Sequence, residues 1–345
     1  MTAFQQHLLQ LLTEIDAICQ KNDITYFLAG GTLLGAIRHQ GFIPWDDDAD
    51  IVMDQEKRQK FRLASQTQLP VSRILSSPQD DPTYPNVFPR YGEKDTACIH
   101  TNQILTNDPP GVIVDIFILD PFDGSRKDYL RYVKNVMLYA DCVNPYSLYG
   151  HRFPLGSNHY PLYRQMMNRF GRRPVLSHIE KKLRSFGANN SSKTILRWSS
   201  MPLVSPRDFY GKAMRVPFEN TTLMIPEKSL SYLLWHYGAD FMMIPPHNER
   251  ESHNAAVNLS VSGDDLRKES QASMDLPSLH QSYYERKKSF LANASMRQQT
   301  RDVLSRTRIL LCYGNLRSAM QLPDNQTARK NRDILKLEPI YRECL

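Results

Sequence analysis

The chain has 345 residues and a formal net charge of +7, with 41% hydrophobic and 23% charged residues, which is ordinary for a globular protein of one large or two modest domains. No apolar run approaches the ~18–20 residues that a bilayer-spanning helix needs. The first 20 residues lack a basic leader and carry leucines at helical spacing, so we expect no signal peptide. Five scattered cysteines without a CxxC pair indicate neither a zinc site nor a disulfide framework, and they favour a cytoplasmic setting.

The charge is unevenly distributed along the chain. Residues 1–149 hold 13 basic and 19 acidic residues, a net charge of −6, whereas residues 150–215 hold 13 and 2, a net charge of +11. An acidic segment followed by a basic one suits a metal site that faces a surface for anions. A solvated basic face is the alternative. A further hypothesis is peripheral docking of the basic segment on the anionic inner face of a membrane.

The first 120 residues alternate between helical and strand patterns. Apolar residues three and four apart predict a helix over 4–19, and a β-branched and aromatic run predicts a strand over 24–28. A glycine pair then forms a turn, and Thr32 is suited to cap the helix that follows. The remaining elements that we expect are a strand over 48–53, a helix over 55–67, a strand near 87–91 and a central strand over 111–119. This alternation predicts an α/β (α+β) core.

The second half of the chain is mainly helical in pattern. We expect helices over 128–138, 178–186 and 226–237, and two short strands at 216–219 and 223–226. Beyond residue 253 the composition becomes polar and basic, with helical periodicity around 304–311. The predicted organisation is therefore a first domain over residues 1–253 and a mainly helical C-terminal extension over 254–345.

The stretch PWDDDADIVMD, residues 44–54, is the most unusual in the chain. Asp48 and Asp50 share one face of the predicted strand because side chains alternate along a strand. Two neighbouring carboxylates repel each other unless a cation lies between them, and oxygen ligands suit Mg²⁺ or Mn²⁺. Asp46 and Asp47 precede the strand and could contribute. A polar loop is the alternative, but aspartate is disfavoured in strands.

Asp115 is a second anomaly because it lies inside the apolar run VIVDIFIL. An unpaired buried carboxylate is very costly, so it needs a cation or a partner such as Arg90. A third carboxylate beside the Asp48–Asp50 strand completes a two-metal template for phosphoryl transfer. In that arrangement Asp115 could also accept the proton of an attacking hydroxyl.

Gly30, Gly31 and Thr32 lie between a strand and a helix, where exposed backbone N–H groups attract phosphate. Arg38 follows on the same helix and could neutralise a phosphate oxygen, although it could equally be a surface arginine. Trp45 could stack on a base or cover the core. The candidate substrate-binding residues are therefore Gly30, Gly31, Thr32, Arg38 and Arg90.

The segment YFLAGGTLLGAIRHQGFIPWDDDADIVM, residues 26–53, closely resembles the LicD family of phosphotransferases, which includes the fukutin-related proteins. Weaker resemblance continues through the Asp115 strand, VPFENTTLMIP at 216–226, LLWHYG and MMIPPHNERESH. The resemblance implies a polymerase-beta-like nucleotidyltransferase core with helical additions. It implies a Mg²⁺- or Mn²⁺-dependent transfer of a phospho-alcohol, typically phosphocholine, from a CDP-alcohol to a sugar hydroxyl of a cell-surface glycan, with release of CMP.

Mapped onto this chain, the family's glycine turn falls on Gly30 and Gly31 and its third carboxylate on Asp115. Its acidic strand supplies the metal-ligand candidates Asp46, Asp48 and Asp50. The catalytic candidates are Asp48, Asp50 and Asp115. Pro217, Phe218 and Glu219 match a family element of unassigned role, as does His253. Position 40 is Gln where the family often has a basic residue, and position 49 is Ala where it often has Ile.

Two other functions use the same residues. A nucleotidyltransferase would move NMP from an NTP to a small molecule or an RNA end, but no RNA-binding motif is visible, so nucleic acid is not the expected partner. A non-catalytic scaffold would be expected to have lost a carboxylate, and none of the three is missing. The expected partners are a CDP-alcohol donor and a glycan acceptor that is lipid-linked or still growing.

Overall fold

The computed structural model describes residues 1–99, 106, 108–144, 160–197, 202–238, 241–247, 250, 256–273, 275, 277–278, 281 and 285. The helices are α1 (Ala3–Lys21), α2 (Gly30–His39), α3 (Gln55–Gln68), α4 (Arg126–Val143), α6 (Tyr160–Phe170), α7 (Arg172–Arg184), α8 (Ser229–Tyr237), α9 (Gly263–Ser273) and the short 3₁₀ helix η3 (Arg207–Phe209). The strands are β1 (Phe27–Leu28), β2 (Asp50–Asp54), β3 (Arg73–Ser76), β4 (Arg90–Glu93), β5 (Ala97–Ile99), β6 (Ile113–Phe122), β7 (Lys193–Arg197), β8 (Leu203–Pro206), β9 (Met214–Phe218), β10 (Thr221–Ile225) and β11 (Ala256–Asn258).

Strand β6 organises a seven-stranded mixed sheet. On one side it pairs in parallel with β2, which in turn pairs with β1. On its other side it pairs first with β4 and then, along its second half, with β7. Strands β3 and β8 extend these two branches. The apolar run around residue 115 is therefore the central strand that the sequence predicts, and the mixed α/β class is confirmed.

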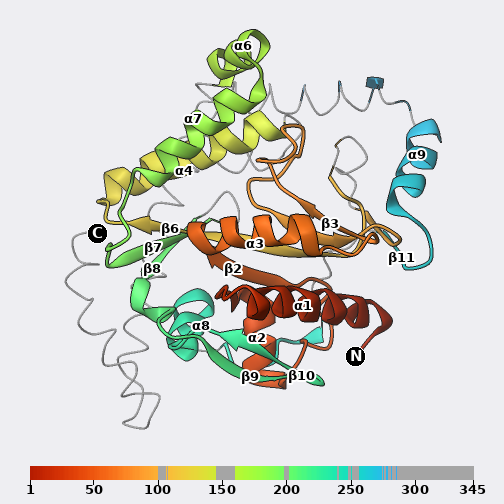
Figure 1. The fold of residues 1–345 in the computed structure, drawn as a ribbon, viewed down its shortest axis with the longest axis vertical. Helices are drawn as coiled ribbons and strands as arrows, with labels where there is room; N and C mark the ends of the chain where they lie inside the picture. The colour runs from red at the N-terminus through yellow and green to blue at the C-terminus, as the bar shows by residue number, and fades with distance from the viewer. Residues whose placement is uncertain are drawn as a thin grey trace.

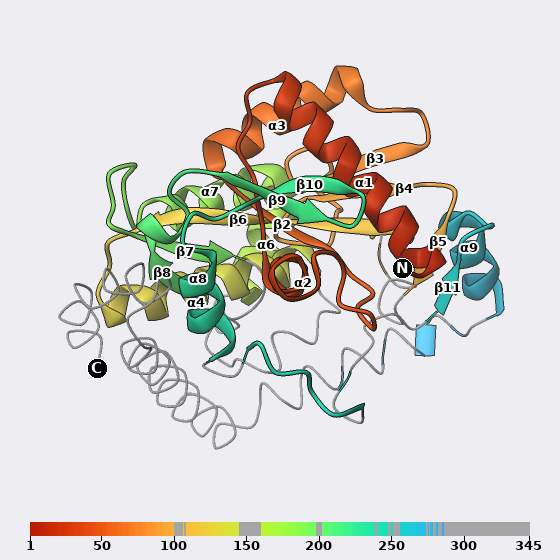
Figure 2. The ribbon, with the colours of Figure 1, turned by 90° about the horizontal axis from the view of Figure 1, so that it is seen from below.

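The helices enclose this sheet unevenly (Figure 1). Figure 2 shows α1 and α3 on one side of the sheet and α2 on the other. Helices α4, α6 and α7 pack together as a separate group beside β6 and β7, as Figure 1 shows. Helix α1 begins with a capping box between Thr2 and Gln5, and its buried stripe contains Leu8, Leu11 and Ile15. No helix in the described part of the chain is both long enough and apolar enough to span a bilayer.

Two small strand pairs lie outside the main sheet. Strands β9 and β10 form an antiparallel hairpin whose turn includes Glu219 at a φ of 52°. Strand β11 pairs in antiparallel with β5, so residues 256–258 lie beside residues 97–99 from much earlier in the chain. The helical periodicity around 304–311 lies outside the described residues, and the domain boundary at 253 stays a prediction.

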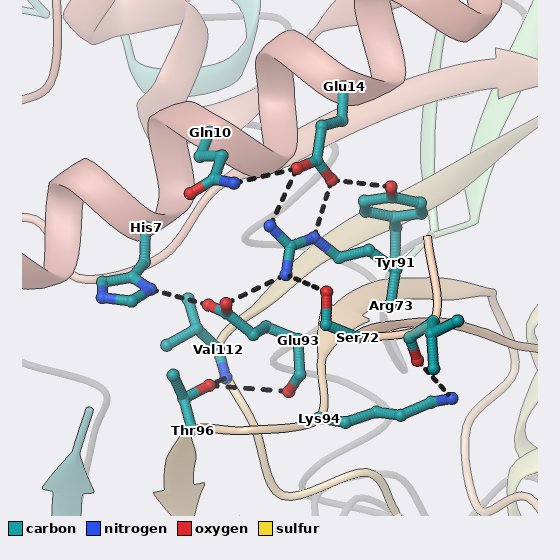
Figure 3. A network of polar contacts seen from close by, with 11 residues as sticks. His7, Gln10, Glu14, Ser72, Arg73, Tyr91, Glu93, Lys94, Thr96 and Val112 are labelled. Atoms are coloured by element: carbon teal, nitrogen blue, oxygen red, sulfur yellow. Dashed lines mark hydrogen bonds and ion pairs between the residues drawn. The ribbon is translucent and has the colours of Figure 1, made fainter. Parts of the chain in front are cut away.

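An ion-pair network attaches α1 to the edge strand β3 and to its neighbour β4 (Figure 3). The Arg73 guanidinium donates to both carboxylate oxygens of Glu14, at 2.7 and 2.8 Å, and to Glu93 at 2.9 Å. Tyr91 donates its hydroxyl to Glu14 at 2.9 Å, and a ring nitrogen of His7 lies 2.6 Å from Glu93. Burial raises the pKa of Glu14, but the hydrogen bonds from Arg73 and Tyr91 outweigh it and leave this pKa lowered.

A second network joins the helical group to the sheet. Arg197 of β7 is fully buried and donates to Glu180 of α7 at 2.6 and 2.9 Å. It also pairs with the buried Asp120 of β6 at 2.9 Å, and Tyr132 of α4 donates to the same Asp120 at 2.5 Å. These contacts fix α4 and α7 against the second half of β6.

Most of the predicted elements exist, with shifted ends. The second strand begins at Asp50 rather than Asp48, so Asp48 lies in the loop before it. The expectation that Thr32 caps α2 is wrong: Ala29 is the N-cap residue, and Thr32 lies buried in the first turns of the helix. Strands β3, β5, β7, β8 and β11 and helix α6 are not among the predicted elements.

Candidate active site

Asp50 and Asp115 are brought together by strand pairing. They are register partners on the parallel strands β2 and β6, and Asp115 is also the register partner of Arg90 on β4. The Asp115 N–H donates to the carbonyl of Ala49 at 2.9 Å, which continues the ladder one residue before β2. Three residues singled out in the sequence thus lie in one row across three neighbouring strands.

The Arg90 guanidinium lies at one end of this row and binds two carboxylates. Its Nε donates to Asp115 Oδ1 at 2.7 Å, and its Nη1 donates to Asp108 at 2.5 Å. Side-chain exposure is 14% for Arg90, 8% for Asp108 and 20% for Asp115. Burial lowers the pKa of Arg90, but the two carboxylates outweigh it and raise this pKa well above the usual range. The partner that the sequence allowed for Asp115 is therefore present.

The glycine pair makes room for two carboxylates. A Cβ added to Gly30 would lie 2.9 Å from Asp50 Oδ2, and a Cβ added to Gly31 would lie 2.9 Å from Asp46 Oδ2. Gly30 also has a φ of 51°, which favours glycine. Asp46 and Asp50 therefore lie against the first turn of α2, where the positive end of the helix dipole stabilises negative charge.

Hydrogen bonds from two distant segments fix the start of α2 and of β2. The Thr32 hydroxyl accepts the Asp50 N–H at 2.9 Å, and Ala29 donates its N–H to the Asp50 carbonyl at 3.0 Å. The Gly30 N–H donates to the Tyr232 hydroxyl of α8 at 3.4 Å. Asp50 is consequently held by its backbone on both sides, while its carboxylate faces Gly30.

Tyr237 is a neighbour of the aspartates that the site prediction omits. Its residue surface is 40% exposed, but its hydroxyl would lie 3.8 Å from a Cβ on Gly30. The pKa of this hydroxyl is raised well above its usual range, first by burial, then by Tyr232 and then by Asp50, Asp46 and Asp48. In the sequence Tyr237 belongs to the segment LLWHYG, which predicts the end of a helix and gives no indication that Tyr237 lies near the aspartates.

The electrostatics of the cluster centre on Asp50. Its pKa is raised well above the usual range, first by burial and then by repulsion from Asp48, Asp115 and Asp46, while Arg90 acts in the opposite direction. Within this arrangement, a bound divalent cation would offset the repulsion between carboxylates.

The donor set fits Mg²⁺ or Mn²⁺ in its chemistry, because it consists of carboxylate oxygens and no thiol or imidazole belongs to it. As the side chains stand, no three His, Cys, Asp or Glu residues in the described part of the chain form a ready-made metal-binding group. The metal-ligand set Asp46, Asp48, Asp50 and Asp115 stays a prediction that is chemically consistent with the site.

Arg38 and Trp45 contact a later segment of the chain. Arg38 Nη1 donates to the carbonyls of Phe241 and Met243, at 3.0 and 2.9 Å, and its Nε donates to His39 at 3.0 Å. Trp45 is partly buried against the core, and the Arg250 guanidinium lies 4.2 Å above its ring. Arg38 thus holds residues 241–243 beside α2, and its predicted role in substrate binding stays untested.

Comparison with known proteins bears on this region. Residues 23–104 match the family described as LicD/FKTN/FKRP, nucleotidyltransferase domain. A segment of 53 residues is 53% identical to the lipopolysaccharide cholinephosphotransferase LicD of Haemophilus influenzae. Segments of 55 and 44 residues are 47% and 54% identical to uncharacterized proteins of Rickettsia typhi and Rickettsia prowazekii.

These matches are short. They cover 15%, 16% and 13% of this chain, and 20%, 18% and 16% of the three relatives. The family match spans β1, α2, the aspartate loop, β2 and the strands up to β5. It ends before Asp115, so the inclusion of Asp115 in the site depends on its register with Asp50.

Proposed function

We propose that this chain, whose residues 23–104 match the LicD family's nucleotidyltransferase domain, is a metal-dependent phosphotransferase that modifies a cell-surface glycan. The reaction is transfer of a phospho-alcohol, phosphocholine being the first candidate, from a CDP-alcohol to a sugar hydroxyl, with CMP as the leaving group. The observation that carries the proposal is the row of Asp50, Asp115 and Arg90 beside the glycine pair.

Each side chain has a role in the proposed reaction. Asp48, Asp50 and Asp115, with Asp46, would hold Mg²⁺ or Mn²⁺. When bound, the metal supplies charge neutralisation at the donor diphosphate and at the departing CMP. Arg90 fixes the Asp115 carboxylate through its Nε contact at 2.7 Å. In the proposed reaction Asp115 accepts the proton of the acceptor hydroxyl. Positioning and charge stabilisation provide most of the rate enhancement.

The start of α2 contributes to anion binding in this proposal. Gly30, Gly31 and Thr32 place the N-terminus of α2 beside the carboxylates. The helix N-terminus favours negative charge, and the glycines allow close approach of other groups to the backbone. In the proposed reaction, the start of α2 would bind the donor phosphates.

The acceptor glycan is proposed to be presented at a membrane surface, on which the α6–α7 region docks peripherally. Exposed basic residues gather there, with Arg164 and Arg169 on α6 and Arg173, Lys181 and Arg184 on α7. Glu180, the acidic residue of these helices, is buried against Arg197. Helices with such a charge balance are attracted to anionic lipid headgroups.

The proposal is tested by measuring CMP release from a panel of CDP-alcohols, with a cell-envelope glycan as acceptor, in Mg²⁺, in Mn²⁺ and in a chelator. Asp48→Asn is the loss-of-function variant, and Asp81→Asn, in an exposed turn, is its matched control. Metal-dependent release that disappears only in the first variant supports the proposal. Turnover of a nucleoside triphosphate without release from any CDP-alcohol would contradict it and favour a nucleotidyltransferase. Metal binding without turnover of either donor would indicate a non-catalytic scaffold.

A further inference from the structure

Glu219 contacts the loop that leads into the aspartates, although 169 positions separate it from Asp50 in the sequence. Its carboxylate Oε1 accepts the Phe42 N–H at 3.0 Å, and its own N–H donates to the Gln40 carbonyl at 2.7 Å. The β9–β10 turn therefore brackets residues 40–42 with one hydrogen bond on each side.

The conformations of both partners are adapted to this contact. Glu219 and Gln40 both have positive φ angles, of 52° and 55°, which are uncommon for residues with side chains. A Cβ added to Gly41 would lie 2.3 Å from Glu219 Oε1, so the glycine leaves space for the carboxylate. Phe42 and Phe218 are buried against each other edge to face, with ring centroids 4.9 Å apart.

The far end of the same loop is held by Gln5 of α1. The buried carboxamide of Gln5 donates to the carbonyls of Ile43 and Asp46, each at 3.0 Å. The Asp46 N–H closes a turn onto the Ile43 carbonyl at 2.9 Å. The loop over residues 40–46 is thus fixed at its start by Glu219 and at its end by Gln5, and it delivers the Asp46 carboxylate to Gly31.

We propose that Glu219 is a positioning residue for the aspartate cluster, acting through residues 40–46 on the placement of Asp46 and Asp48. The inference rests on the proposed function, because the placement matters only if the aspartates hold the metal. Glu219 does not touch the reacting atoms in this assignment. Its carboxylate holds the loop in place before the metal binds. Metal binding then does not carry the entropic cost of ordering that loop.

A matched control exists in the same part of the chain. Glu227 Oε2 accepts the Lys212 N–H at 2.8 Å, and Glu227 lies against Gly211 as Glu219 lies against Gly41. The Glu227 carboxylate thus also accepts a hydrogen bond from a backbone turn, but that turn contains none of the four candidate metal ligands. Glu219→Ala and Glu227→Ala therefore remove equivalent contacts with different consequences.

The experiment measures Mn²⁺ binding to the full chain by isothermal titration calorimetry, together with the Mn²⁺ dependence of CMP release and the free energy of unfolding. Glu219→Ala is expected to weaken Mn²⁺ binding about five- to tenfold, the scale of one hydrogen bond. Glu219→Gln retains an acceptor oxygen and should stay within about twofold of wild type, and so should Glu227→Ala.

Gly41→Ala provides an independent variant, because its Cβ would displace the Glu219 carboxylate. It should weaken Mn²⁺ binding as Glu219→Ala does, and the double variant should be no weaker than Glu219→Ala alone, since the displaced group is then absent. Additive effects of the two substitutions would overturn the inference.

The outcomes separate the inference from the proposed function. If Asp48→Asn abolishes Mn²⁺ binding while Glu219→Ala matches Glu227→Ala, then Glu219 is only a structural residue and the inference fails. If Asp48→Asn itself leaves Mn²⁺ binding unchanged, the aspartates are not the metal site and the proposed function fails.

Discussion

Asp50 and Asp115 are register partners on adjacent parallel strands, so strand pairing itself sets the approach of two carboxylates. Asp50 is 8% exposed, and burial and neighbouring aspartates raise its pKa. In the absence of a cation, Asp50→Asn should leave the free energy of unfolding at pH 7 unchanged or raise it, because the carboxamide removes a charge that burial and the neighbouring aspartates disfavour. Chemical denaturation in a chelator measures this.

The same substitution should abolish CMP release, because a carboxamide is a poor ligand for Mg²⁺ or Mn²⁺. Wild-type turnover in Asp50→Asn would contradict the metal site. A loss of several kcal/mol of stability would show instead that the Asp50 carboxylate is needed for folding.

Asp108 and Asp115 both form an ion pair with Arg90, but only Asp115 belongs to the proposed metal site. Both bind Arg90, and only Asp115 lies in register with Asp50. Asp108→Asn and Asp115→Asn should each destabilise the fold by about 1–3 kcal/mol, since each weakens a charge-assisted hydrogen bond. Turnover should survive within about tenfold in Asp108→Asn and disappear in Asp115→Asn. Equal losses of turnover would assign Asp115 to the ion pair alone.

The buried network around Arg197 predicts an acid-dependent loss of stability. Glu180 lies against Arg197, and although burial raises its pKa, the Arg197 charge and hydrogen bonds outweigh burial and lower this pKa from 4.5 to about 2. A carboxyl group with a lowered pKa stabilises the fold above pH ~4.5, and this contribution is lost as the pH falls toward 2.

Glu180→Gln should therefore be less stable than wild type by about 3 kcal/mol at pH 7, and the difference should shrink between pH 4.5 and pH 2. Urea denaturation at a series of pH values measures both. A difference that stays constant down to pH 2 would show that Glu180 is not held ionised by Arg197.

The sequence predicted the parts of the site that are local in the chain. Asp115 stands out because one charge interrupts an apolar strand, and the aspartate cluster stands out because like charges adjoin a strand. The sequence alone did not show why residues 30 and 31 are both glycine. The structure shows that the Asp50 carboxylate lies against Gly30 and the Asp46 carboxylate against Gly31, where a Cβ would collide with them.

Contacts between distant segments could not be read from any local pattern. Glu219 matches a family element of unassigned role at the end of a predicted strand, and no local pattern predicts its contact with residues 40–42. Arg197 ends a short apolar run, and its burial depends on Glu180 and Asp120 from two other elements. Strands β3, β5, β7 and β8 have five residues or fewer, which gives too few alternations for a reliable period.

The exposed basic residues of α6 and α7 predict salt-dependent binding to anionic vesicles. Wild type should sediment with phosphatidylglycerol vesicles at low ionic strength and be released as salt screens the attraction. Arg164→Glu, Arg169→Glu and Lys181→Glu combined should abolish sedimentation, because these exposed residues change a region of positive charge into a negative one.

Lys60→Glu, Arg131→Glu and Lys268→Glu combined form the control, since they make the same change in net charge at exposed positions on α3, α4 and α9. This control should still sediment with the vesicles. Equal loss of binding in both triple variants would attribute the interaction to net charge alone, and binding that persists at high salt would replace the electrostatic interpretation with an apolar one.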